Sequence, residues 1–301
     1  MKTFRCFGLL LVVVGCTLLA LAPRASAQSD LEKTLQQFNA NDVKGYIQPL
    51  ADLFGANMNA GMFHSADIAK TGFHLSFELV AMGASVSDKQ KTYTLNAPAG
   101  FTPGTFTTAT MFGGARDSVV DTKTNLKYLG IADGFVNTSI FPLAAPQLTI
   151  GDVFGTRAII RYIAIPSIKG FPGASLWGLG LQHSVNQWVP VIPLDVAAHV
   201  YYSKFSFGDL VNFSGLSIGA DVSKSVSILR VYGAVVWEKS SMELKYTPSN
   251  AAVPAVDITM DGANNFRATV GVGLHIVFFT IFADANFGSI TNYSAGIGFG
   301  G

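Results

Sequence analysis

Hydrophobic and polar residues alternate with a period of two along most of the chain from Gly72 onward. Eight segments of 8–11 residues show this pattern, and their apolar faces carry no Asp, Glu, Lys or Arg. The segments are 73–81, 157–164, 194–203, 216–223, 229–238, 266–276, 279–288 and 293–300. A period of two is typical of a half-buried β-strand, and a tilted strand needs ~9–11 residues to cross a bilayer. The pattern therefore predicts strands with one face in lipid.

The opposite faces of these segments are polar but only sparsely charged, and they also hold apolar residues such as Ile159 and Phe282. The charged positions on them are Glu78, Arg157, Arg161, Asp195, Asp221, Arg230, Glu238, Arg267 and Asp284. A soluble sandwich or a lipocalin-like barrel turns this face to water and needs more Lys and Glu there. A helical membrane protein needs ~20 predominantly apolar residues in a row. The best candidate for such a helix, 270–283, has 14 residues and includes His275.

A closed barrel satisfies its backbone groups without water, so it can span lipid with this weak signal per strand. Further strand candidates lie at 90–97, 105–112, 127–135 and 175–183. We therefore expect an all-β fold, a closed antiparallel transmembrane β-barrel of about 12–14 strands. The longer polar stretches at 84–92, 113–126 and 247–265 are expected to be extracellular loops. Candidates for the aromatic girdles are Trp177, Trp237, Tyr162, Tyr202, Phe287 and Tyr293.

The composition also favours a protein that meets lipid. Only 13% of the 301 residues are charged, against roughly 25% in an ordinary soluble domain. Half of the chain is hydrophobic, and the mean hydropathy is +0.37. A net charge of +1 and an aromatic content of 12% exclude a basic nucleic-acid binder and a disordered chain.

Residues 1–27 read as a secretory signal peptide. Lys2 and Arg5 precede the apolar run 7–22, and Ala25-Ser-Ala27 offers a small-residue cleavage site. The alternatives are an uncleaved anchor and a lipoprotein signal at Cys16. Cleavage removes both cysteines and lowers the net charge from +1 to −2, because the leader holds three basic residues and no acidic one. The expected location is the cell outer membrane.

Residues 28–62 differ from the rest because their apolar positions recur at helical spacing. Ser29 to Glu32 forms a capping-box pattern before a first amphipathic stretch over 31–38. A second stretch carries Tyr46, Leu50 and Leu53 on one face; we expect Pro49 to interrupt it and Gly55 to end it. The sequence therefore predicts a helical hatch or plug at 28–62 and an outer-membrane barrel at 63–301.

The stretch from Lys44 to Ala66, KGYIQPLADLFGANMNAGMFHSA, resembles the opening of an uncharacterised outer-membrane β-barrel family of Gram-negative envelopes, a domain of unknown function. The following GFHLSFELVAM, from Gly72, extends the resemblance, which is sharpest over about 44–84. It implies a barrel with a short N-terminal helical segment. It carries over no ligand and no catalytic residue.

The general layout is also similar to that of the outer-membrane transporters of long-chain fatty acids and aromatic hydrocarbons, which have an N-terminal hatch in the lumen. Their Asn-Pro-Ala hatch motif is not present, and the nearest match, Asn59-Ala-Gly61, lacks the proline. The C-terminus also departs from the usual final aromatic residue of such barrels, since Phe299 is followed by two glycines.

Motifs for catalysis or metal binding are weak. Gly215-Leu-Ser217-Ile-Gly219 matches an esterase pattern that has meaning only at a strand–turn–helix elbow, and here it lies inside an alternating segment. The five histidines form no metal-ligand spacing. We expect no catalytic residue, no metal and no cofactor, and keep an envelope hydrolase with Ser217 as a remote alternative.

The first functional hypothesis is passive transport of small hydrophobic or amphipathic molecules through a monomeric barrel with a hatch. The residues expected to form hatch contacts or bind a ligand are Tyr46, Pro49, Leu53, Phe54, Asn57, Arg157, Arg161 and Arg230. The expected partners are outer-membrane lipid, a small hydrophobic ligand and the barrel assembly machinery, with no nucleic acid. The alternative is a structural or surface-interaction barrel whose long loops carry the function. Because the lumen charges nearly balance, we expect them to form paired networks.

Overall fold

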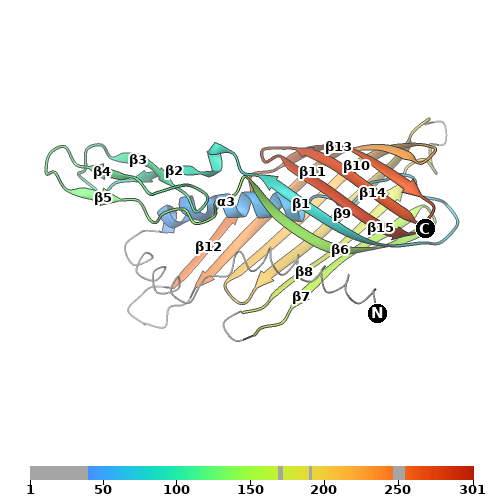
Figure 1. Ribbon diagram of the computed structural model, residues 1–301, viewed down its shortest axis with the longest axis horizontal. Coiled ribbons are helices and arrows are strands. Elements are labelled where there is room, and N and C mark those ends of the chain that lie inside the picture. Colours follow the sequence, from blue (N-terminus) through green and yellow to red (C-terminus); the bar gives the residue numbers. More distant parts are fainter. Residues whose placement is uncertain (1–39, 169–171, 190–191, 247–254) are drawn as a thin grey trace.

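The computed structural model describes residues 40–168, 172–189, 192–246 and 255–301, and the predicted leader and first helical stretch lie outside them. Within these ranges, ten antiparallel strands close into a barrel (Figure 1). In order around the wall they are β1 (His74–Ser85), β6 (Ile140–Val153), β7 (Thr156–Ile165), β8 (Ala174–Ser184), β9 (Asp195–Phe207), β10 (Val211–Val226), β11 (Leu229–Tyr246), β13 (Phe266–Ile276), β14 (Phe279–Phe287) and β15 (Asn292–Gly300). Pairing of β15 with β1 closes the ring.

The predicted fold class is confirmed, but the predicted number of strands was too high. The expected strands at 90–97, 105–112 and 127–135 form two small hairpins outside the barrel. These are β2 (Thr92–Asn96) with β3 (Thr105–Ala109), and β4 (Ser118–Val120) with β5 (Lys127–Leu129). They follow a short 3-10 helix, η1 (Asp88–Gln90), and β12 (Val256–Asp261) extends the wall beyond β13 by pairing with the far half of β11. Short alternating runs look the same in sequence whether they enter a closed wall or pair locally.

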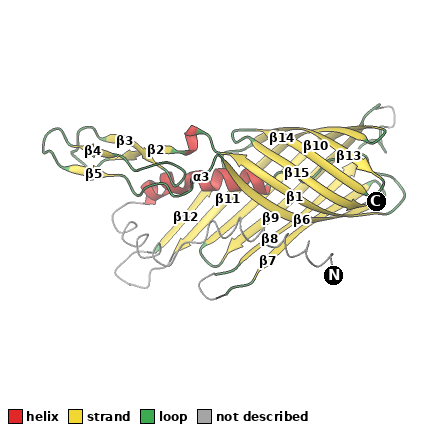
Figure 2. Ribbon diagram, viewed as in Figure 1, coloured by secondary structure: helices red, strands yellow, loops and turns green. Residues whose placement is uncertain are grey.

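The two ends of the barrel have connections of different length. One end, the short-turn end, has two-residue turns at 154–155, 227–228 and 277–278 and a longer connection at 185–194. The other, the long-loop end, has connections at 166–173, 208–210, 247–255 and 288–291. It also carries residues 86–139, here called the excursion, which hold both hairpins and project away from the wall (Figure 2). In outer-membrane barrels the short turns face the periplasm and the long loops face outward.

The alternation of side chains follows the predicted faces. On β1, Phe77 is exposed on the outer wall whereas Glu78 and Val80 are buried inside. The six girdle candidates all lie exposed on the outer wall, near the long-loop end. A second group of exposed aromatic side chains, Phe73, Phe154, Phe278, Phe279 and Phe299, lies near the short-turn end. The outer surface is therefore an apolar band between two aromatic belts, as in a protein that spans lipid.

One helix, α3 (Ala40–Met58), lies at the long-loop end and enters the barrel there (Figure 1). It is continuous through Pro49 and Gly55, so the expected interruption and stop were wrong. Proline removes one backbone hydrogen bond, but burial of Leu53, Phe54 and neighbouring side chains inside the barrel outweighs that loss. Among the described residues, no helix has the length and apolar character needed to cross a membrane.

Candidate functional site: the barrel interior

Residues 59–67, here called the interior thread, continue from α3 along the lumen toward the short-turn end. The thread has no strand partner, so its backbone carbonyls need donors from elsewhere. Side chains of the wall supply them: Arg267 binds the Asn59 carbonyl (2.8 Å), Arg161 binds those of Ala60 (2.9 Å) and Gly61, Gln147 that of Met62 (3.0 Å), Gln182 that of Ser65 (3.0 Å) and Arg157 that of Asp67 (3.0 Å). The thread is thus clamped by side chains from β6, β7, β8 and β13.

The donors that hold the thread are themselves held by buried carboxylates. Gln147 donates to Glu78 (2.8 Å), and Gln182 donates to Asp221 (2.9 Å). Each carboxylate also meets a histidine: Glu78 binds His64 of the thread at 2.8 Å, and Asp221 binds His199 at 2.7 Å. Each of these two networks ends on the thread. The expected pairing of lumen arginines with lumen carboxylates is found only in part: Glu78 and Asp221 meet histidines, and Arg161 binds amide and backbone oxygens.

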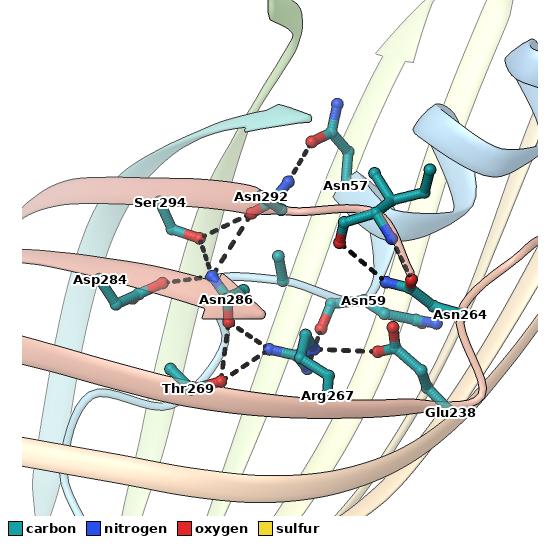
Figure 3. A network of polar contacts seen from close by, with 12 residues as sticks. Asn57, Asn59, Glu238, Asn264, Arg267, Thr269, Asp284, Asn286, Asn292 and Ser294 are labelled. Atoms are coloured by element: carbon teal, nitrogen blue, oxygen red, sulfur yellow. Dashed lines mark hydrogen bonds and ion pairs between the residues drawn. The ribbon is translucent and has the colours of Figure 1, made fainter. Parts of the chain in front are cut away.

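A third network surrounds Arg267 where α3 becomes the thread (Figure 3). The Arg267 guanidinium donates to Glu238 (3.0 Å) on β11 and to the Asn286 side-chain oxygen (2.5 Å) on β14. Nearby, the Asn57 side chain donates to the Phe141 carbonyl (2.7 Å) and accepts a hydrogen bond from Asn292. These contacts tie the end of α3 to both sides of the β15–β1 closure.

Ring stacking and one glycine fix the path of the thread. Phe63 stacks on His199 with ring centroids 4.7 Å apart, and His64 stacks on Phe282 at 4.3 Å. Gly61 has a φ of +64°, and a Cβ there would lie 2.8 Å from a methyl carbon of Val80. Only glycine combines that backbone conformation with such a close approach to the wall.

The long-loop half of the interior is apolar, in contrast to the thread. The Phe54 ring lies 4.2 Å from Phe213 and 4.7 Å from Phe205, centroid to centroid, and 6.3 Å from Phe141. Other apolar side chains of the wall join the same buried cluster, here called the apolar chamber: Leu143, Ala145, Ala174, Leu176 and Met242, with Ile163 and Ile165 at its edge. The interior is therefore divided into an apolar zone around α3 and a polar zone around the thread.

The structure places most of the predicted site residues in these two zones. Leu53 and Phe54 lie in the chamber, Pro49 is buried within α3, and Asn57 joins the network around Arg267. Arg161 clamps the thread inside the predicted hatch range. Arg157 binds the carbonyl of Asp67, beyond residue 62, so the interior segment is longer than predicted.

Two predicted residues lie elsewhere. Tyr46 faces the excursion: its hydroxyl donates to the Asp133 carbonyl (2.8 Å), and its own carbonyl accepts from the Met111 N–H (3.1 Å). Arg230 lies near the short-turn end, where its Nε donates to Ser225 (3.1 Å). In the ranges that the structure covers, no hydrogen bond or ion pair joins Arg230 to residues 40–62.

Sequence reasoning missed the amides that hold the thread. Gln147, Gln182 and Asn292 are buried inside the barrel, and none of them was singled out. The sequence feature that could have identified them is a side-chain amide at an inward-facing position of a predicted strand. That pattern predicts a polar partner in the lumen and does not say which segment supplies it.

Ser217 lies in the middle of β10, fully buried, and not at a strand–turn–helix elbow. Its hydroxyl has no hydrogen-bond partner among the described residues, and neither does Nε2 of His199 on the neighbouring strand. The esterase pattern is therefore part of a barrel strand. Across the described ranges, no group of three His, Cys, Asp or Glu side chains is arranged to hold a metal ion.

One protein family and several solved structures are similar to the chain. The profile of a family of unknown function, DUF6588, matches residues 1–301, which confirms the resemblance seen in the sequence. No curated protein matches the chain. The chain is similar to OmpF of Salmonella typhi, solved in complex with daunomycin, with 10% identity, 77% of this chain and 98% of that chain covered, and a TM-score of 0.25.

Two further solved structures are similar at the same low level. The toluene transporter TbuX of Ralstonia pickettii has 10% identity, covers 85% of this chain and 92% of its own, and gives a TM-score of 0.24. The translocator domain of the autotransporter NalP of Neisseria meningitidis has 11% identity to this chain, with a TM-score of 0.23. The match covers 86% of this chain and 95% of the NalP domain. The closed wall with its apolar outer band is that of an outer-membrane β-barrel protein.

Proposed function

The chain belongs to DUF6588, a family of unknown function. We propose its function from the division of its interior into an apolar zone and a polar zone. The chain takes small hydrophobic or amphipathic molecules from the cell exterior into the apolar chamber, and α3 acts as the hatch over them. It resides in the outer membrane and is exported by a cleaved signal peptide. The observation that carries the proposal is the ring cluster of Phe54, Phe141, Phe205 and Phe213 at the long-loop end.

The polar zone argues against a simple water-filled pore. A porin interior leaves an aqueous channel, whereas here the thread is bonded to the wall along its length. Arg161 is only 1% exposed. Polar solutes and ions therefore find no path, while an apolar molecule can exchange with side chains of its own kind in the chamber.

Uptake in cells tests this proposal. Expression of the chain in a porin-deficient strain should raise uptake of radiolabelled decanoic acid and leave uptake of radiolabelled sucrose unchanged. Phe54→Asn, which puts an amide in the chamber, should reduce decanoic acid uptake, and the lipid-facing Phe77→Asn should not. Equal increases for both solutes would contradict the proposal.

The excursion favours a second candidate, a barrel that acts through surface interaction. It exposes apolar side chains, including Leu126 in the turn between β4 and β5 and Phe135 after β5, at the end that faces outward. Removing residues 115–130 keeps Met111 and Asp133, which contact α3. If surface interaction is the function, this deletion should abolish cell–cell adhesion of expressing cells and leave decanoic acid uptake unchanged.

A further inference from the structure

The wall of the barrel is not hydrogen-bonded all the way round. Pairing between β6 and β7 ends at Gln147 and Arg161. Beyond that point, residues 140–146 of β6 pair only with β1, and residues 162–165 of β7 pair only with β8. These two facing edges are here called the seam, and the two strands splay apart toward the long-loop end (Figure 1).

The register shows which backbone groups face the seam. The Val86 N–H donates to the Ser139 carbonyl, and antiparallel hydrogen-bonded pairs recur at every second residue. The odd-numbered residues of this part of β6 therefore bond to β1, and the even-numbered ones point toward β7. By the same rule, the bond from Ser184 N–H to the Gly155 carbonyl directs Tyr162 and Ala164 of β7 toward β6.

Proline occupies two seam positions on β6 and the first position after β7. Pro142 and Pro146 have no N–H to offer β7, and Pro166 follows at the end of β7. If the register that pairs Gln147 with Arg161 is extended toward the long-loop end, Pro146 lies opposite Tyr162 and Pro142 lies opposite Pro166. Proline in a sheet is confined to edges, and here it sits on the unpaired edges of strands that are paired on their other side.

One further backbone N–H of β6 that points toward β7 has its hydrogen bond within its own segment. The Ile140 N–H donates to the Thr138 hydroxyl (3.2 Å), and that hydroxyl donates to the Ile140 carbonyl (2.6 Å). Unpaired backbone groups in lipid are costly, and open edges persist only where they are covered, wet or relieved of donors. Residue choice therefore removes or satisfies the seam donors at 140, 142 and 146 on β6, whereas Ala144, Tyr162 and Ala164 keep theirs. On the β6 side, the opening is largely built into the sequence.

The seam borders the apolar chamber directly. Leu143 and Ala145 line it on the inside from β6, and Ile163 and Ile165 from β7, and all four belong to or pack against the cluster that holds Phe54. On the outside lies the aromatic belt, where Tyr162 is 62% exposed. On the short-turn side of the chamber the thread is bonded to the wall, so the seam is the apolar way out of the chamber.

We propose that the seam is a lateral portal. Through it, a small molecule with an uncharged apolar body moves between the apolar chamber and the outer interface of the bilayer. The identity of this cargo rests on the proposed function, whereas the opening itself does not. Transport would then end in the membrane and not in the periplasm.

Cysteine labelling tests the portal directly, because both cysteines of the chain lie in the predicted leader. In liposomes, Ile163→Cys, behind the seam, should react with pyrene maleimide dissolved in the bilayer. It should react poorly with a charged water-soluble maleimide. The control is Val236→Cys, also inward-facing but on β11, where both neighbouring strands are paired, and it should stay unlabelled by either reagent.

Closing the seam provides the second arm. Pro142→Val with Pro146→Val restores two donors facing β7 and should lower pyrene labelling of Ile163→Cys about tenfold, as expected from roughly 1.4 kcal/mol gained by renewed pairing. Pro98→Val, in the excursion, is the matched control. Heat-modifiable migration confirms that each variant folds.

Three results would overturn the portal: labelling of Ile163→Cys no greater than that of Val236→Cys, equal labelling by the charged reagent, or no effect of the proline replacements. Decanoic acid uptake separates the two proposals. Lost uptake specificity with intact seam labelling would refute the proposed function and leave the portal standing.

Discussion

At the scale of residues, the interior is organised by donors that satisfy a backbone with no partner strand. Arginine and glutamine suit this task because one side chain can bind a carbonyl of the thread and a second acceptor on the wall. Gln147 does so between Met62 and Glu78, and Arg267 between Asn59 and Glu238. Each such residue joins the thread to a strand, so a single substitution breaks several bonds.

Arg161→Met tests this at one position. Methionine keeps the bulk of the side chain but leaves the carbonyls of Ala60 and Gly61 and the Gln147 oxygen without their donor. The loss should destabilise the barrel by roughly 2–5 kcal/mol. It should be visible as a lower temperature for the shift between folded and unfolded bands on electrophoresis. The neighbouring lipid-facing Ile160→Met should leave that temperature unchanged; equal temperatures for both variants would argue against the clamp.

The buried pair of Arg267 and Glu238 makes a separate prediction. Glu238→Met leaves a buried guanidinium without its carboxylate and should cost about 3–5 kcal/mol. Adding Arg267→Met should recover part of that loss, because the double variant holds no unpaired charge. A double-mutant cycle measured by urea unfolding reports the coupling. Strictly additive losses would mean that the two groups do not act as a pair.

At the scale of elements, the sequence predicted strands well where both faces had a defined environment. The alternation over 266–276 and 279–288 matches β13 and β14 almost residue for residue, because lipid and lumen select opposite residue types. The prediction was wrong for the hairpins of the excursion, which were expected to be strands of the barrel wall. Their short apolar faces pack locally, and nothing in their pattern distinguishes that from a place in the wall.

The helix was also only partly predictable. Its apolar positions were recognised, but Pro49 and Gly55 argued for breaks that packing inside the barrel overrides. The clamps were beyond sequence reasoning, since Arg161 and Gly61 are a hundred residues apart and meet only after the wall has closed. Only the division of inward and outward residues could be derived from the pattern alone.

The turn between β4 and β5 should be sensitive to acid. The pKa of the Asp121 carboxyl is lowered, first by a hydrogen bond from the Thr124 hydroxyl and then by the Thr102 N–H. Because the folded pKa lies below that of the unfolded chain, the carboxylate stabilises the turn above the ordinary range of about pH 4. That contribution is lost as pH falls through the lowered pKa.

Hydrogen exchange of residues 118–129 checks this expectation. Protection, corrected for intrinsic rates, should fall below about pH 4 in the native chain. In Asp121→Asn it should be weaker at neutral pH and change less with acid. An acid response that persists unchanged in this variant would assign the effect to another group.

At the scale of the whole molecule, three zones follow one another along the barrel axis, and one seam interrupts the wall. The excursion and the start of α3 meet at the long-loop end, the apolar chamber lies next to them, and the clamped thread lies in the short-turn half. The β6–β7 seam opens the wall beside the chamber and not beside the thread. Under the proposed function, a molecule that enters from outside meets the clamped thread below it and the seam beside it.

Planar bilayer recording of the full chain tests the central claim most directly, because a closed floor forbids ion flow. The account predicts that the native protein inserts without any lasting ion conductance. It also predicts that the double variant Arg161→Met with Arg267→Met, which frees the thread at two clamps, shows channel openings. A stable, ohmic pore in the native protein would contradict the account, because it would mean that the interior thread does not seal the barrel.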